Sequence, residues 1–193
     1  MRTLSHLLMT ALINRKLPKH GMPQHTLALL VGAVLPDFAF VLLTLGYEVY
    51  YRWVSAPPPN PYSSIMEYLH FDLFFNDPIW IVAHNTFHSL VVNLLLLLIG
   101  YVALKYTIRW GSFLFWLATA MLLHTVVDMF THTSDGPLIF FPLNWTYRFS
   151  SPISYWETGF FGGQFIIIEY TVDLIILVYF ARLWWKRRRL KSV

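Results

Sequence analysis

The chain has 193 residues, of which 56% are hydrophobic and only 12% are charged. Soluble globular domains carry about a quarter charged residues, so this composition excludes an ordinary soluble domain and predicts one all-α domain embedded in a membrane. There is no cysteine, which excludes disulfides and thiolate metal sites. The net charge of +4 is explained by basic residues flanking the predicted spans, and not by a nucleic-acid partner.

Four apolar segments are each near the length of about 20 residues that a helix needs to cross a bilayer. In chain order they cover residues 27–47, 79–104, 110–132 and 160–184. An earlier apolar run, 4–13, is only half as long, and Asn14, Arg15 and Lys16 follow it in place of a small-residue cleavage site. We expect it to be a retained short helix that lies at the interface or dips into the bilayer.

Lysine and arginine residues predict the orientation of these spans. Twelve of the 14 basic residues, Lys19 among them, fall on one side, and only Arg52 and Arg148 fall in the two opposite loops. Because basic residues favour the cytoplasmic side, both termini are predicted to be cytoplasmic in a multi-pass protein of the bacterial inner membrane. The loops 48–78, with its proline-rich stretch 57–61, and 133–159 are predicted to lie outside.

The third span carries three ionisable residues with a spacing of four: His124, Asp128 and His132. Residues four apart lie on one face of a helix, and two imidazoles with a carboxylate are a metal-ligand set. Ionisable groups inside a bilayer are costly, so the triplet predicts a metal site. The alternative is a buried network of salt bridges and hydrogen bonds between helices.

Further ionisable residues are predicted to lie at the same depth in the bilayer as the triplet of the third span. At 1.5 Å per helical residue, His88 lies about 14 Å and His124 about 12 Å below the outer surface. Asp37, which follows the helix-kinking Pro36, is predicted as a metal ligand or general base. Glu169 in the fourth span reaches a similar depth and is the second candidate for a catalytic carboxylate.

The position of His6 depends on the first helix. If this helix rises from a cytoplasmic anchor at Arg15 and Lys16, His6 lies about 14 Å up, in the same layer. Arg2 would then lie deeper still and would have to face a hydrated cavity or a phosphate. If the helix lies flat on the membrane, His6 is merely interfacial.

Several short motifs occur in a familiar order: Ser5-His6, Leu35-Pro36-Asp37, His88-Ser89, and His124-x3-Asp128-x2-Thr131-His132 followed by Gly136 and Pro137. This order resembles the membrane-bound metal-dependent hydrolase family of bacteria, which is distantly similar to zinc-dependent phospholipase C. The resemblance implies a first metal site formed by Asp37, His88, His124 and Asp128. It implies a second site that joins His6 to Asp128, with His132 nearby. A further ligand pair of the soluble enzymes includes a later histidine, and none follows His132 here.

The predicted activity is hydrolysis of a lipid or phosphoester at the outer leaflet. One or two divalent ions, with zinc preferred, would activate water, and Asp37 or Glu169 would orient it or take its proton. Arg148 in the outer loop is the predicted ligand for a lipid phosphate. The expected partner is membrane lipid and not nucleic acid, and the sequence does not determine the oligomeric state.

Two other functions remain open at this point. Intramembrane histidines and carboxylates can form a proton or metal-ion transporter or channel, although four spans without a repeat are few for a carrier unless it oligomerises. The third possibility is a non-catalytic membrane protein whose metal site is purely structural.

Overall fold

A computed structural model describes residues 1–17, 25–55 and 62–191, and every regular element in these ranges is helical. The predicted all-α membrane fold is therefore confirmed. The predicted proline-rich turn at 57–61 and the basic residue Lys19 lie outside the described residues.

The helices of the described residues include three that are long and apolar enough to cross a membrane: α2, α7 and α8. The pair α5 and α6 makes a fourth candidate span with a bend of 45°. In chain order the helices are α1 (Thr3–Lys16), α2 (Thr26–Trp53), α3 (Ile65–Tyr68), the π-helical turn η1 (Leu69–Leu73), α4 (Phe74–Asn76), α5 (Pro78–His88), α6 (Leu90–Lys105), α7 (Gly111–Thr131), the 3-10 turn η2 (Thr158–Phe160) and α8 (Gly162–Lys191).

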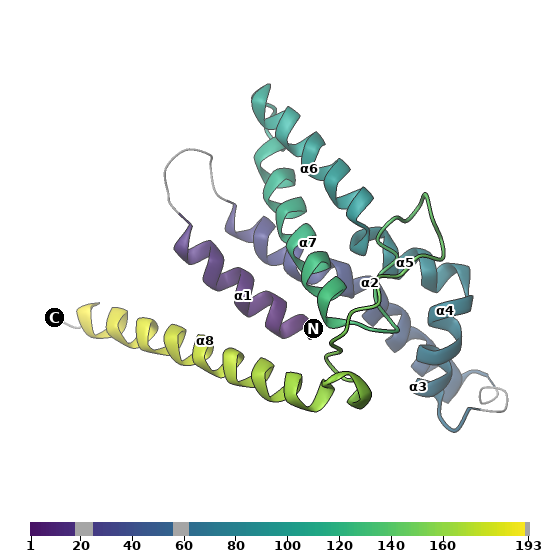
Figure 1. The fold of residues 1–193 in the computed structure, drawn as a ribbon. Helices are drawn as coiled ribbons and strands as arrows, with labels where there is room; N and C mark the ends of the chain where they lie inside the picture. Colours follow the sequence, from purple (N-terminus) through teal and green to yellow (C-terminus); the bar gives the residue numbers. More distant parts are fainter. Residues whose placement is uncertain (18–24, 56–61, 192–193) are drawn as a thin grey trace.

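Helix α7 packs against both α2 and α6 and forms the centre of the bundle (Figure 1). Two glycines permit these close approaches. A Cβ atom on Gly32 of α2 would lie 2.4 Å from the carbonyl oxygen of Leu117, and one on Gly100 of α6 would lie 2.6 Å from the backbone nitrogen of Phe115. Small residues of this kind let helix backbones approach one another inside a membrane.

The segment predicted as a single span at 79–104 is two helices that meet at Ser89. Asp77 caps α5 by accepting hydrogen bonds from the backbone N–H groups of Ile79 and Trp80, at 2.8 and 3.2 Å. Ser89 has an extended backbone, and its hydroxyl then caps α6 by accepting from Val92 N at 3.3 Å. The break leaves His88 as the last residue of α5, where its side chain faces the bundle interior.

The segment predicted as an outer loop at 48–78 is largely helical where it is described. Helix α2 continues to Trp53, and the short run α3–η1–α4 folds back against it (Figure 1). An apolar cluster of Leu69, Leu73, Phe74 and Trp80 holds this run in place, with Phe40 of α2 packed against it. Burial of these side chains supplies the attachment.

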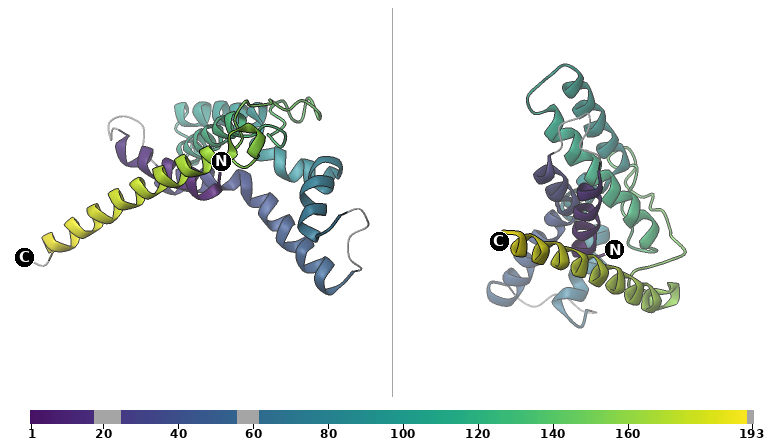
Figure 2. Two further views of the ribbon diagram at one scale, coloured as in Figure 1. Left: turned by 60° about the horizontal axis from the view of Figure 1, so that its bottom comes forward. Right: turned by 90° about the vertical axis from the view of Figure 1, so that its left-hand side faces the viewer.

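Helix α8 runs alongside α1 and extends past it (Figures 1 and 2). Its apolar side chains, such as Ile167, Ile168 and Leu174, are exposed. In contrast, Glu169 and Asp173 of this helix are buried against α1. An outer helix of a membrane bundle shows this arrangement, with its apolar faces toward lipid and its carboxylates turned inward.

Candidate metal centre

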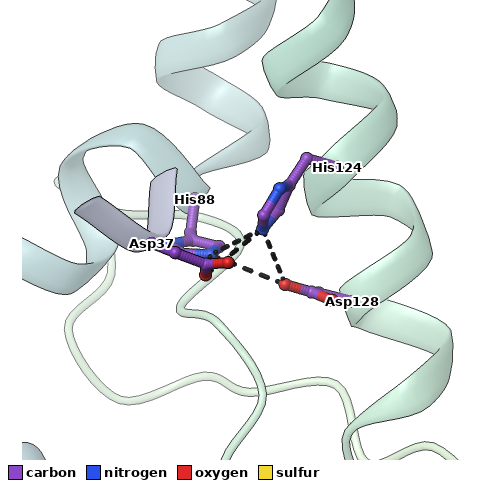
Figure 3. A group of neighbouring side chains, drawn as sticks. All are labelled: Asp37, His88, His124 and Asp128. Atoms are coloured by element: carbon purple, nitrogen blue, oxygen red, sulfur yellow. Dashed lines mark hydrogen bonds and ion pairs between the residues drawn. The ribbon is translucent and has the colours of Figure 1, made fainter. Parts of the chain in front are cut away.

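Four of the predicted ligands meet at one point inside the bundle (Figure 3). Asp37 comes from α2, His88 from the end of α5, and His124 and Asp128 from successive turns of α7. Each residue offers one ligand atom, and these atoms all lie within 4.8 Å of one another. Two imidazoles and two carboxylates are a donor set that suits a divalent cation.

The spacing of the four ligand atoms fits a tetrahedral ion. The two Nε2 atoms of His88 and His124 are 3.2 Å apart, and each lies 3.3 to 3.4 Å from Asp37 Oδ1. Asp128 Oδ2 is 3.0 Å from His124 Nε2 and 3.5 Å from His88 Nε2. Zinc bonds of about 2.1 Å in tetrahedral geometry place neighbouring ligand atoms roughly 3.4 Å apart, so these residues fit such an ion.

Backbone carbonyl groups fix which imidazole nitrogen faces the centre. His88 Nδ1 donates to the carbonyl oxygen of His84 at 2.7 Å, and His124 Nδ1 donates to that of Ala33 at 2.8 Å. Since a carbonyl can only accept, each Nδ1 carries a proton, and each Nε2 of a neutral ring then presents a lone pair. Such contacts to the second ring nitrogen are the usual support of metal-ligating histidines.

A salt-bridge network without an ion satisfies this geometry less well. Two neutral rings would face their Nε2 lone pairs at each other across 3.2 Å. If both rings were protonated, two N–H groups of like charge would meet across the same distance. One proton shared between the rings would give Asp37, which pairs with these two rings, a single positive partner, whereas Asp128 also pairs with the amino group of Met1. A divalent cation satisfies all four groups at once.

Asp37 reaches the centre because of two features of α2. Gly32 allows the backbone of α2 to approach Leu117 of α7 closely. Pro36 has no N–H group to bond the carbonyl of Gly32 one turn back, and the neighbouring carbonyl, that of Ala33, accepts from His124. The same short stretch of sequence therefore supplies one ligand and orients another.

His88 is held at the break between α5 and α6 by contacts that the sequence analysis missed. Leu90 N donates to Ile139 O at 3.0 Å, and Leu138 N donates to Asn85 Oδ1 at 2.7 Å. Asn93 Nδ2 donates to the carbonyl oxygen of Phe87 at 3.0 Å. Non-helical backbone inside a membrane needs such partners. The available signal was the pair of asparagines, Asn85 and Asn93, in an otherwise apolar span.

The second oxygen of Asp128 faces a different set of groups. His6 Nε2 lies 2.8 Å from Oδ1, and so does the amino group of Met1. The His6 ring stacks on His124 with a centroid separation of 3.6 Å. His132 lies beside this set, with Nδ1 3.0 Å from the carbonyl oxygen of Asp128 and 3.7 Å from its Oδ1. One carboxylate therefore contacts residues of both implied metal sites.

Helix α1 brings two further polar residues to the centre, and neither was predicted as a site residue. Thr3 donates its hydroxyl to Asp37 Oδ2. Arg2 binds Glu169, with Nη1 3.1 Å from Oε2 and its backbone nitrogen 2.8 Å from Oε1. Glu169, predicted as a catalytic carboxylate, thus lies outside the four-residue group and is paired with Arg2. No sequence pattern pointed to Thr3.

A cavity of about 980 Å³ opens beside the four-residue group. Asp37, His88, Asp128 and His132 line it, as do Arg2 and Tyr155. Burial raises the pKa of the Tyr155 phenol, so this residue stays protonated at neutral pH and can donate a hydrogen bond. His84, one helical turn before His88 and stacked on it, also lines the cavity.

Arg148, the predicted ligand for a lipid phosphate, is engaged by the protein. It donates to the carbonyl oxygen of Gly136, and its guanidinium lies 5.1 Å from the ring centroids of both Phe74 and Phe75. Burial lowers its pKa to about 10, so it remains charged at neutral pH. It is not among the described residues that line the cavity.

These features define an all-helical membrane protein with a candidate metal centre between its spanning helices. The chain belongs to the YdjM inner membrane protein family, whose model matches residues 1–191. The predicted location in the inner membrane of bacteria is therefore confirmed. Neither the curated proteins nor the solved structures gave a match.

Proposed function

We propose that the protein is a membrane-embedded, zinc-dependent hydrolase that acts on a lipid or phosphoester at the outer leaflet. The convergence of Asp37, His88, His124 and Asp128 carries this proposal: their ligand atoms all lie within 4.8 Å of one another, and the pairs that involve an imidazole are 3.0 to 3.5 Å apart. Two imidazoles in a tetrahedral set favour zinc over magnesium or calcium, which prefer six or more oxygen ligands. The order of the motifs and their resemblance to metal-dependent hydrolases support the reaction type.

The four groups divide into holding and reacting residues. His88, His124 and Asp128 are buried, whereas the Asp37 side chain is 19% exposed and lines the cavity. A catalytic zinc site usually has three protein ligands and a fourth position open to substrate, so in the working enzyme His88, His124 and Asp128 would hold the ion and Asp37 would give up the fourth position to water. A bound cation would polarise the ester and activate water. Asp37 then orients this water and accepts its proton, while the hydroxyl of Thr3 holds the far oxygen of the carboxylate.

The distribution of basic residues supports an outer-leaflet substrate. The basic C-terminal end of α8, the Arg15–Lys16 end of α1 and the short link between α6 and α7 would face the cytoplasm, whereas the amino group of Met1 lies at the centre beside Asp128. The cavity lining includes Ser134 and Asp135 from the loop that follows α7, which this orientation places outside. Substrate would therefore enter from the outer leaflet.

Metal content and turnover of the full chain, purified in detergent, test the proposal. A micellar alkyl 4-nitrophenyl phosphodiester serves as substrate, and chelation followed by zinc addition should abolish and restore its hydrolysis. His124→Ala should remove both the bound zinc and the turnover. Asp37→Asn should retain zinc and lose about 100- to 10,000-fold in rate, as expected for loss of a general base. His25→Ala, a histidine at the start of α2 outside the centre, is the matched control.

Two results would contradict the proposal. Bound zinc that stabilises the protein against heat, with no turnover of any ester, would show a structural metal. Ion flux in proteoliposomes that requires Asp128, again without turnover, would show a transporter.

A further inference from the structure

The cavity beside the metal centre differs in character along its wall. One part is formed by ionisable side chains of the centre, Asp37, His88 and Asp128. Another part is aromatic, formed by Phe40, Phe71, Phe74 and Phe75. A cavity of about 980 Å³ is large enough for a lipid-sized ligand. Its lining suits a molecule with a polar head and an apolar tail.

Arg2 is the only lysine or arginine among the described residues that line this cavity. Its guanidinium forms an ion pair with Glu169 and lies 4.4 Å from the ring centroid of Tyr170. The Arg2 side chain is 34% exposed, whereas that of Glu169 is 1% exposed. A guanidinium has five N–H donors, and the ion pair uses only part of them. The remaining donors can meet a ligand in the cavity.

The charges around the cavity indicate what Arg2 can bind. Two other carboxylates line the cavity and accept hydrogen bonds from neutral groups: Glu67 from Ser63, and Asp135 Oδ2 from the indole N–H of Trp156 at 2.9 Å, while the amino group of Met1 adds a positive charge beside Asp128. Asp37 and Asp128 would repel an anion unless a cation lies between them. With that cation bound, the centre and Arg2 present two positive groups to one cavity. Guanidinium groups bind phosphate in a two-pronged geometry.

We propose that the cavity binds an amphiphile with a phosphate head, placed between the metal centre and Arg2, and with its tail against the aromatic wall. The proposal rests on the proposed function in one respect, because the cation of that site forms part of the head-group site. Arg2 then determines specificity for a charged head, the role that the sequence analysis predicted for Arg148. The cost of placing Arg2 among membrane helices is offset by Glu169 and by the bound anion.

Binding of decylphosphonate, which cannot be hydrolysed at its carbon–phosphorus bond, tests the proposal without turnover. Titration calorimetry on the zinc-loaded full chain in neutral detergent should show tighter binding of decylphosphonate than of decanol or of inorganic phosphate. Arg2→Gln should weaken decylphosphonate binding about 10- to 100-fold, as expected for loss of a charge-assisted contact, and leave decanol binding unchanged. Removal of zinc should weaken decylphosphonate binding as well.

Three further variants separate the roles of charge, structure and tail. Glu169→Gln keeps the charge of Arg2 and should preserve decylphosphonate binding; an equal loss in Glu169→Gln and Arg2→Gln would show that Arg2 only attaches α8. Phe71→Ala should reduce the gain in affinity between hexylphosphonate and decylphosphonate. Arg52→Gln, which removes an exposed arginine paired with Glu48 in α2, is the control and should bind as wild type does.

The outcomes also distinguish this proposal from the hydrolase proposal. Arg2-dependent phosphonate binding in a protein without turnover would retain the amphiphile site and overturn the hydrolase. If turnover requires zinc but phosphonate binding is weakened by Arg148→Gln and not by Arg2→Gln, the hydrolase proposal is retained and the Arg2 site is overturned. Equal affinity for inorganic phosphate and decylphosphonate would overturn the amphiphile and leave a site for free phosphate.

Discussion

The metal centre and the α1–α8 face are held together in different ways. At the centre, backbone geometry determines where each ligand lies: Gly32 sets the distance between α2 and α7, and carbonyl groups orient both imidazoles. At the α1–α8 face, side-chain pairs make the attachment, through Arg2 with Glu169 and Ser5 with Asp173. Substitutions in the bundle should therefore change metal binding, whereas substitutions on α8 should change only what α1 adds to the centre.

The strongest test of this difference is Gly32→Val. A Cβ atom at this position would lie 2.4 Å from Leu117 O, so α2 and α7 must separate, and the Ala33 carbonyl of α2 then no longer orients the ligand His124. We expect a loss of stability of about 1–3 kcal/mol together with loss of bound zinc. Thermal denaturation and elemental analysis measure both. Gly46→Val, in the same helix but with nothing within 4 Å of the added atom, is the control. Equal losses in both variants would show that α2 merely tolerates valine poorly.

A smaller effect is expected from Ser89→Ala. This change removes the cap of α6 and the hydrogen bond from the Ser89 hydroxyl to the carbonyl oxygen of Phe141. The cost should be about 1–2 kcal/mol in thermal stability, with weaker zinc binding because His88 precedes the break. Thr86→Ala, which removes a hydrogen bond from the hydroxyl to Val82 O within the same helix, should cost less and leave zinc affinity intact. Unchanged zinc affinity in Ser89→Ala would show that the break between α5 and α6 does not position His88 for metal binding.

The smallest of the three effects on the centre and the α1–α8 face is expected from Asp173→Asn on α8. The Oδ2 atom of Asp173 accepts from Ser5 at 2.7 Å, and an asparagine oxygen can replace it. We expect a loss of about 1 kcal/mol or less, with full zinc content, measured by denaturation and elemental analysis. Glu48→Gln, which breaks an exposed pair with Arg52, should cost still less. Loss of zinc in Asp173→Asn would contradict the separation of the two regions.

Depth and helical period placed the four residues of the centre in one layer together with Glu169, and the family resemblance singled out the four. His124 and Asp128 share a face of α7 because they are one turn apart, and His88 and Asp37 were matched to them by depth alone. The all-α fold followed from composition and from the length of the apolar runs. The roles of these residues as ligands or base stay predictions until metal content and turnover are measured.

The same reasoning could not place residues around the bundle axis. Glu169 has the predicted depth, but depth does not tell on which side of the bundle a side chain lies, and α8 directs it to Arg2. His132 continues the spacing of four, yet α7 ends at Thr131 and His132 has an extended backbone; its Nδ1 stays 3.7 Å from Asp128 Oδ1, but it is not one of the four residues that meet at the centre. The residue at which a helix ends, and the side of the bundle that a side chain faces, depend on tertiary packing. The periodicity of a single span carries no information about that packing.

The two oxygens of Asp128 have a thermodynamic consequence. Oδ2 belongs to the four-residue group, while Oδ1 contacts His6 of α1. Binding of an ion at Oδ2 therefore alters the free energy of the contacts that α1 makes at Oδ1. By reciprocity, those contacts alter the free energy of ion binding by the same amount. Uptake of a first ion and docking of α1 should thus be cooperative events joined through a single side chain.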